Sequence, residues 1–274
     1  MTKEINLEWA QSLLNKDKKG SDFVSDLPQI DWVQNNKNFK RNLKFKVVPA
    51  NSKENKIFSH IVATHWNLGP NKDKRFVCPE QTLHLKNLGI KCPVCEAKRR
   101  LLAKGFTEEQ LSTQGKFGLI PVFDPTITSN VKVVVMDSDM KKDWDQAHIS
   151  VLQQKGDFLS RWLVEKYSRE DIPDFLQWNN SNLITFSRDT DNGKWEREFS
   201  FATFNPSEEV LAKLKEENEA FVMPDLWKAP TDQEILEIKA IVEEMEKSYL
   251  DARNAYNEAT SYTSKIDERD QIPF

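Results

Sequence analysis

The sequence has no long apolar run and is short of several kinds of residue, and each shortage excludes a class of protein. No stretch approaches the roughly 20 apolar residues of a membrane helix, so we expect no membrane partner. The amino terminus lacks the basic, apolar and small-residue pattern of a secretory signal, so we expect an unprocessed cytoplasmic protein. The eight glycines are scattered, and none begins the G-x-x-x-x-G-K pattern of a phosphate-binding loop.

Cysteine is also scarce, with three residues in 274. An odd number of cysteines that includes one C-x-x-C pair favours metal or thiol chemistry over a disulfide framework. The remaining composition, 38% hydrophobic and 30% charged, is typical of a soluble globular protein.

The net charge of −4 by itself argues against nucleic-acid binding, since such domains are usually basic. The charge is unevenly distributed, however. Residues 31–105 hold 16 Lys and Arg against 5 Asp and Glu, a net charge of +11, whereas residues 201–274 hold 8 against 17, a net charge of −9. A basic window of this length attracts polyanions, although any single cluster within it could equally be an ordinary solvated face.

Hydrophobic periodicity predicts an α+β fold with a mainly β core of at least six strands. Two strand-like runs within 40–66 predict a hairpin, and two more around the turn at 189–193 predict a second hairpin. Apolar residues at helical spacing predict helix over 143–167, broken near Gly156. The expected organisation is an N-terminal arm (1–30), a β core (31–205), an acidic helical region (206–260) and a flexible tail (261–274).

Four residues predict a metal site. His65, Cys78, Cys92 and Cys95 stand as H-x12-C-x13-C-x2-C, and a Cys3His set is typical of structural zinc. His84 and His60 compete with His65 for the fourth position. Four protein ligands leave the ion without the open coordination position that a catalytic zinc needs. The glutamate that a zinc deaminase uses as general acid and base is also missing from the expected position, so we expect that the protein is not an enzyme. A zinc-containing nucleic-acid enzyme or primase-like module is the alternative.

Aromatic residues beside cations predict a surface on which bases stack and phosphates bind, although each aromatic residue alone could equally belong to the core. In Leu43–Val47 the lysines alternate with apolar residues, so the two kinds of side chain lie on opposite faces of a strand. We therefore expect Lys44 and Lys46 to contact nucleic-acid phosphates and Phe45 to lie in the core. The candidate nucleic-acid contacts are Lys44, Lys46, Trp66, Lys72, Lys74, Arg75, Phe76, Arg99, Lys116, Phe117, Lys194, Trp195 and Arg197.

A heptad stripe follows the capping-box pattern of Thr231 and Glu234 near the carboxyl terminus. It predicts a long helix whose stripe packs on the β domain. The alternatives are a coiled coil with another chain, hence self-association, or a protein-interaction adaptor. The stripe comprises Ile235, Ile238, Val242, Met245, Tyr249, Ala252, Tyr256 and Ala259.

Several of these motifs occur in an order that resembles the single-stranded-DNA-binding proteins of T-even-type phages. The resemblance rests on the segments 44–53, 61–66, 92–95 and 124–125 together with Cys78, and covers about residues 38–200. It implies an OB-fold core with a zinc subdomain at about 60–105, and His65, Cys78, Cys92 and Cys95 as ligands. It also implies a protein that coats single-stranded DNA during phage replication, recombination and repair in the host cytoplasm.

The last eight residues, 267–274, resemble the acidic tip of bacterial single-stranded-DNA-binding proteins. The resemblance implies that Ile272, Pro273 and Phe274 dock into replication or recombination enzymes. Phe274 would fill an apolar pocket while its terminal carboxylate meets a basic group.

Overall fold

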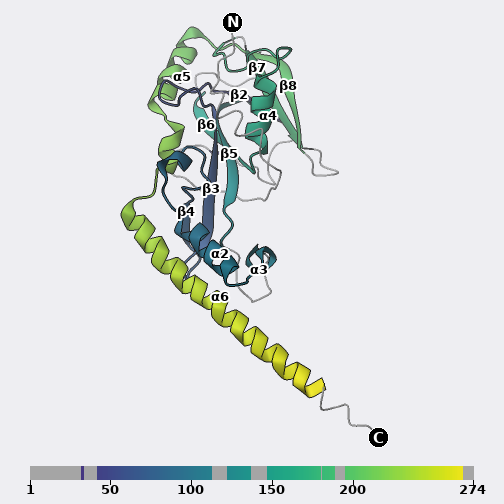
Figure 1. The fold of residues 1–274 in the computed structure, drawn as a ribbon. Coiled ribbons are helices and arrows are strands. Elements are labelled where there is room, and N and C mark those ends of the chain that lie inside the picture. The colour runs from purple at the N-terminus through teal and green to yellow at the C-terminus, as the bar shows by residue number, and fades with distance from the viewer. Residues whose placement is uncertain are drawn as a thin grey trace. The chain divides into compact units, whose positions relative to one another are not determined.

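The fold is mixed α+β, as predicted, with a mainly antiparallel sheet (Figure 1). It is seen in a computed structural model that describes residues 32–33, 42–112, 122–136, 147–179, 181–188 and 195–267. The chain divides into two compact units, one of Met1–Val62 with Thr126–Lys228 and the other of Ala63–Pro125 with Ala229–Phe274. The acidic region expected at 206–260 is therefore shared between both units.

The first unit is built on a sheet whose strands follow the order β1-β6-β5-β2-β7-β8. Its neighbouring strands are antiparallel except for the parallel pair β1 and β6. Among the described residues no pairing joins β1 to β8, so the sheet is not closed into a barrel. These strands are β1 (Trp32–Val33), β2 (Asn42–Val47), β5 (Thr126–Met136), β6 (Ile149–Lys155), β7 (Ser181–Arg188) and β8 (Trp195–Phe204).

One predicted hairpin is confirmed and the other is wrong. β7 and β8 are antiparallel partners, as their spacing predicts. β2 instead pairs with β5 and β7, whereas the next strand, β3 (Ser59–Leu68), pairs with β5 and with β4 (Lys74–Val77). Alternating apolar residues define the two faces of a strand but do not select its partner.

The helix predicted over 143–167 is also wrong in its first half. Residues 149–155 form strand β6, and only Phe158–Tyr167 is helical (α4). The first four residues of β6 are all buried, so both faces of the strand are interior and its apolar residues do not show the alternation that would distinguish it from a helix. Gly156, with a positive φ of 75°, separates the two elements.

Helix α5 (Glu208–Ala220) and the 3-10 helix η3 (Met223–Trp227) complete the first unit. The Ser207 side chain accepts a hydrogen bond from the Val210 N–H and so caps the start of α5. Val210 and Leu214 bury the apolar face of this helix in a core cluster. The other members of the cluster are Val48, Val134, Ile149, Leu183 and Phe204.

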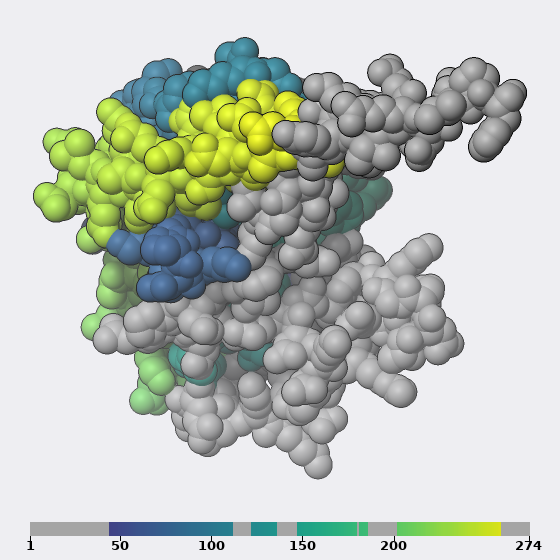
Figure 2. All heavy atoms as spheres, turned by 90° about the horizontal axis from the view of Figure 1, so that it is seen from below, coloured from purple at the N-terminus to yellow at the C-terminus, as the bar shows by residue number. Residues whose placement is uncertain are grey.

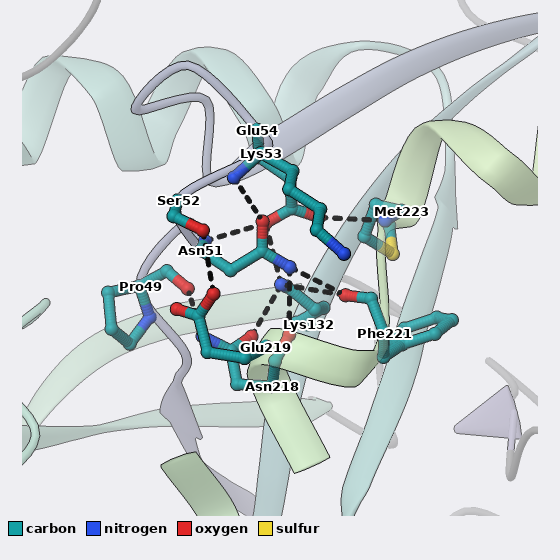
Figure 3. A network of polar contacts seen from close by, with 10 residues as sticks. All are labelled: Pro49, Asn51, Ser52, Lys53, Glu54, Lys132, Asn218, Glu219, Phe221 and Met223. Carbon is teal, nitrogen blue, oxygen red and sulfur yellow. Dashed lines mark hydrogen bonds and ion pairs between the residues drawn. The ribbon is translucent and has the colours of Figure 1, made fainter. Parts of the chain in front are cut away.

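A buried polar network fastens the end of α5 to the loop after β2 (Figure 3). The Asn51 side-chain amide donates to the carbonyls of Asn218 and Phe221 at the carboxyl end of the helix, where carbonyl groups lack the full set of intrahelical donors. The Glu54 carboxylate accepts hydrogen bonds from the backbone N–H groups of Asn51 and Met223. Segments far apart in the sequence thus share one hydrogen-bonded interior.

The second unit consists of the part of β3 from Ala63 onward, β4, short helices and one long helix. These are η1 (Lys86–Leu88), α2 (Pro93–Ala103), α3 (Glu108–Ser112) and α6 (Asp232–Asp267). The predicted capping box is confirmed at the start of α6: the Glu234 N–H donates to the Thr231 hydroxyl, and the Thr231 N–H donates to the Glu234 carboxylate.

Helix α6 packs on α2, within the unit that carries the cysteines. Because α2 lies inside the region 31–205 that was expected to form the β domain, the expected packing of the stripe on that region is confirmed. Figure 2 shows the yellow atoms of α6 against the blue atoms of α2. Ile238, Val242 and Tyr249 of the heptad stripe are buried, and the Tyr249 ring packs on Phe106 and Phe123. The later part of the stripe differs, because residues 254–258 are exposed.

Candidate metal centre

His65, Cys78, Cys92 and Cys95 meet in the interior of the second unit, with all of their ligand atoms within 4.8 Å of one another. The Cys92 and Cys95 sulfurs lie 3.4 and 3.6 Å from His65 Nε2. The Cys78 and Cys95 sulfurs lie 3.6 Å apart. All four residues are buried, so the cluster is enclosed by protein.

These separations fit a tetrahedral metal ion. Metal–sulfur bonds of about 2.3 Å and a metal–nitrogen bond of about 2.0 Å place sulfurs about 3.8 Å apart and sulfur and nitrogen about 3.5 Å apart. The observed separations agree with these values to within 0.2 Å or so. The cluster can therefore hold one ion through four protein ligands, and it contains His65 rather than His84 or His60.

The orientation of His65 suits it to metal binding. Its Nδ1 lies 3.3 Å from the carbonyl oxygen of Val122, which can only accept a hydrogen bond. Nδ1 therefore carries the proton, and the lone pair of Nε2 points to the cysteines. A hydrogen bond of this kind fixes the ring and raises the basicity of the ligating nitrogen.

Helix α2 positions the C-x-x-C pair. Cys92 is its N-cap residue and Pro93 stands in its first turn, where a missing N–H costs nothing. The Cys92 N–H donates to the Glu80 carboxylate at 2.8 Å, and Arg99 donates to both oxygens of that carboxylate at 2.8 and 3.0 Å. The Arg99 hydrogen bonds hold the pKa of Glu80 below its usual value. Glu80 is thus a charged support for the backbone of a ligand.

The remaining supports come from the same segment. The Gln81 amide lies 3.7 Å from the Cys95 sulfur, and the Thr82 hydroxyl bonds both the N–H and the carbonyl of Ala63. Sequence analysis did not identify Glu80, Gln81, Thr82 or Val122 as site residues. The only local signal is that the first three closely follow Cys78, where loop residues commonly support a ligand.

Three thiols this close cannot all be ionised without a cation among them. Hydrogen bonds from Cys78 and Cys92 lower the pKa of Cys95. The pKa of Cys92 is raised by its hydrogen bonds to Cys78 and Cys95 and by burial. The Cys92 thiol lowers the pKa of Cys78, but Cys95 and burial outweigh it and raise the value to about 12. A divalent ion would stabilise all three thiolates together.

Two of the residues expected to contact nucleic acid are buried. Lys46 is fully buried, and its Nζ donates to the carbonyls of Val47 and of Phe175, the latter at 2.6 Å. The assignment of Lys46 to phosphate is therefore corrected. β2 lies between β5 and β7, and both Phe45 and Lys46, on opposite faces of the strand, are buried. The alternation of apolar residues and lysines in β2 therefore did not indicate a solvent-exposed face. Phe76 is 5% exposed and packs in the interior. Lys44 is half-buried, and Phe45 lies in the core as expected.

Trp66, Lys72, Lys74 and Arg75 all lie in the β3–β4 hairpin of the second unit, beside the metal ligands. Trp66 and Lys74 are half-buried, whereas Lys72 and Arg75 are exposed. The Arg75 guanidinium carbon lies 6.0 Å from the centre of the Trp66 ring.

Many cations of the second unit are neutralised by acids of the same unit. The charge of the basic window is therefore only partly available at the surface. The pairs are Lys74 with Glu237, Lys98 with Asp124 and Glu108, Arg99 with Glu80, and Arg100 and Lys104 with Glu246.

The other candidate contacts are not placed by the structure. Lys116, Phe117 and Lys194 lie outside the described residues, as do Ile272, Pro273 and Phe274 of the tail and the N-terminal arm 1–30. Trp195 and Arg197 belong to β8, for which the backbone alone is described.

The chain matches no protein-family model, and no curated protein sequence matches it. In the part of the chain that the structure describes, no helix combines the length and apolarity needed to cross a bilayer.

Proposed function

We propose that the protein is a non-enzymatic single-stranded-DNA-binding protein that contains a structural zinc ion. The observation that carries the proposal is the buried cluster of His65, Cys78, Cys92 and Cys95. These are the residues that the resemblance to T-even-type phage proteins implies as ligands. A closed set of four ligands suits a structural ion, because a catalytic zinc keeps one position open.

Zinc is the ion that this donor set favours. Thiolate-rich tetrahedral sites with one imidazole select zinc over the hard cations magnesium and calcium, which prefer oxygen ligands. The ion would join β3, the loop at 78–82 and the start of α2, which are distant in sequence. It would therefore stabilise the second unit.

The DNA-binding part of the proposal rests on two further observations. The antiparallel, mainly β first unit is compatible with an OB-type core, a fold that commonly binds single strands. The β3–β4 hairpin presents Trp66, Lys72 and Arg75, an aromatic residue with two exposed cations. Aromatic faces with a basic surround bind single strands without reading sequence.

A titration of the zinc-loaded chain with oligo-dT at two salt concentrations tests the proposal. We expect binding in the nanomolar to micromolar range that weakens steeply with salt, because phosphate contacts release counterions. A duplex of the same length should bind more weakly. Equal affinity for the duplex, or an affinity independent of salt, would contradict the proposed function.

The C-terminal tail and helix α6 are the two segments relevant to binding of other proteins. We propose that residues 267–274 dock on replication or recombination proteins, as the resemblance to bacterial tips implies. Helix α6 gives less support to the adaptor alternative, because Ile238, Val242 and Tyr249 of its stripe are buried within the protein's own second unit. These residues are not available for a coiled coil with another chain.

A further inference from the structure

The two faces of the β3–β4 pair differ in burial and in the kinds of side chain that they carry. His65 and Phe76 are cross-strand partners, and both are buried on the face that holds the metal ligands. Trp66 follows His65, and Arg75 precedes Phe76. The register shifts between His65 and Leu68, so Trp66 and Asn67 together lie opposite Arg75. Because neighbouring side chains of a strand alternate between faces, Trp66 and Arg75, each adjacent to a member of the His65–Phe76 pair, belong to the opposite face. Their greater exposure agrees with this assignment.

We propose that Trp66 and Arg75 form a stacking subsite for one nucleobase of a bound single strand, a proposal that rests on the proposed function. The Arg75 guanidinium lies over the Trp66 ring at 6.0 Å, at the outer limit of a cation–π contact. A base can stack on the indole ring while the planar guanidinium packs on the base. Every base has such a π-face, so the subsite is insensitive to sequence.

The metal ligands make this subsite rigid. The peptide that carries Trp66 follows directly on His65, whose ring is held at Nδ1 by Val122 and at Nε2 by the cluster. A preorganised aromatic ring loses little conformational entropy when a base stacks on it. The turn that joins the strands carries the exposed Lys72, which can contact an adjacent phosphate.

The other aromatic candidate of this hairpin does not suit the role. Phe76 is 5% exposed and lies on the metal-side face, so a base cannot reach its ring. In this hairpin the base-stacking role therefore belongs to Trp66.

The test compares two oligonucleotides of equal length and charge, oligo-dT and an oligomer in which the bases are replaced by abasic sites. Fluorescence anisotropy of labelled oligomers gives the affinity of the zinc-loaded full chain. We expect Trp66→Ala to weaken oligo-dT binding by about 5- to 150-fold, the range for loss of one stacked base. Binding of the abasic oligomer should change by less than about 2-fold, because it offers no base to stack.

Two conservative variants distinguish stacking from charge and from folding. Trp66→Phe keeps an aromatic face and should recover part of the oligo-dT affinity. Arg75→Lys keeps the charge but loses the planar group, so it should weaken oligo-dT binding without changing the salt dependence. Trp162→Phe is the matched control, since Trp162 is a half-buried tryptophan of α4 in the first unit. It should leave both affinities unchanged.

The outcomes separate the two proposals. If the unmodified protein binds neither oligomer, the proposed function fails. If it binds oligo-dT, but Trp66→Ala changes neither affinity or weakens both oligomers equally, the stacking subsite is wrong. Zinc content and circular dichroism show whether Trp66→Ala is folded. Should that variant lose its metal, Arg75→Lys decides, because an unchanged affinity for oligo-dT in that variant would overturn the subsite.

Discussion

Lys132 Nζ lies 2.6 Å from Glu54 Oε2 in the interior of the first unit, where the two side chains are 1% and 0% exposed. Lys132 also donates to the Asn218 side chain at the end of α5, and Glu54 accepts from the Met223 N–H (Figure 3). The ion pair therefore joins the loop after β2 to β5, and the hydrogen bonds of its two partners attach the segment after α5.

Removing either partner should strongly destabilise the first unit. Lys132→Met or Glu54→Gln leaves one buried group without its counter-charge, and we expect a loss of about 3–5 kcal/mol in the free energy of unfolding. The double variant should lose less than the sum of the single variants, because neither charge is then left alone. Urea denaturation measures all three. Additive losses would show that the two groups do not interact energetically.

Lys46 should make stability depend on pH. Burial lowers the pKa of Lys46 to about 7, against about 10.5 in an unfolded chain. Between these values the unfolded state binds a proton that the folded state does not, so stability rises with pH across this window. Below about pH 7 both states are protonated, and the full cost of the buried charge remains.

Lys46→Met tests this dependence, because methionine fills a similar volume without titrating. The slope of stability against pH from 7 to 10 should be smaller in the variant, by up to about 1.4 kcal/mol per pH unit. Urea titrations of both proteins at several pH values give the difference, in which the other titrating groups cancel. Parallel slopes would mean that Lys46 is not neutral in the folded protein at high pH.

His65→Ala and His84→Ala form a matched pair for the metal centre. His65 provides the nitrogen of the cluster, so its loss should lower zinc affinity and thermal stability, whereas His84→Ala should retain one zinc per chain. Native mass spectrometry gives the metal content, and a chelator titration gives the affinity. Cobalt substitution adds a spectroscopic check, since a tetrahedral thiolate site has intense visible absorption. Loss of metal from His84→Ala alone would reverse the assignment.

Glu80→Gln should weaken zinc binding without removing a ligand. The substitution abolishes the carboxylate that accepts from the Cys92 N–H and from Arg99. Loss of such an outer partner commonly costs about 10- to 100-fold in metal affinity. Glu96→Gln is the control, because Glu96 lies in the first turn of the same helix but is not one of the four residues of the cluster. An equal effect of both variants would point to helix electrostatics as the cause.

Local features of the structure were predictable. The ligand set follows from the spacing of His65, Cys78, Cys92 and Cys95, and the choice of His65 over His84 needed only the fold to bring one of them to the cysteines. The β7–β8 hairpin and the capping box at Thr231 were also predicted, because a short turn or a three-residue spacing specifies each of them.

The tertiary structure decided the features that depend on partners distant in sequence. The pattern around Lys46 separated the two faces of β2, but only the pairing with β5 and β7 and the cover by Phe175 made both faces interior. The same holds for the heptad stripe, which specified an apolar helix face and not the α2 surface that buries it. The sequence by itself thus determined the three cysteines of the candidate metal centre and the start of α6, since spacing along the chain indicates them. Which charges are buried and which remain exposed depended on the long-range packing that a one-dimensional pattern does not contain.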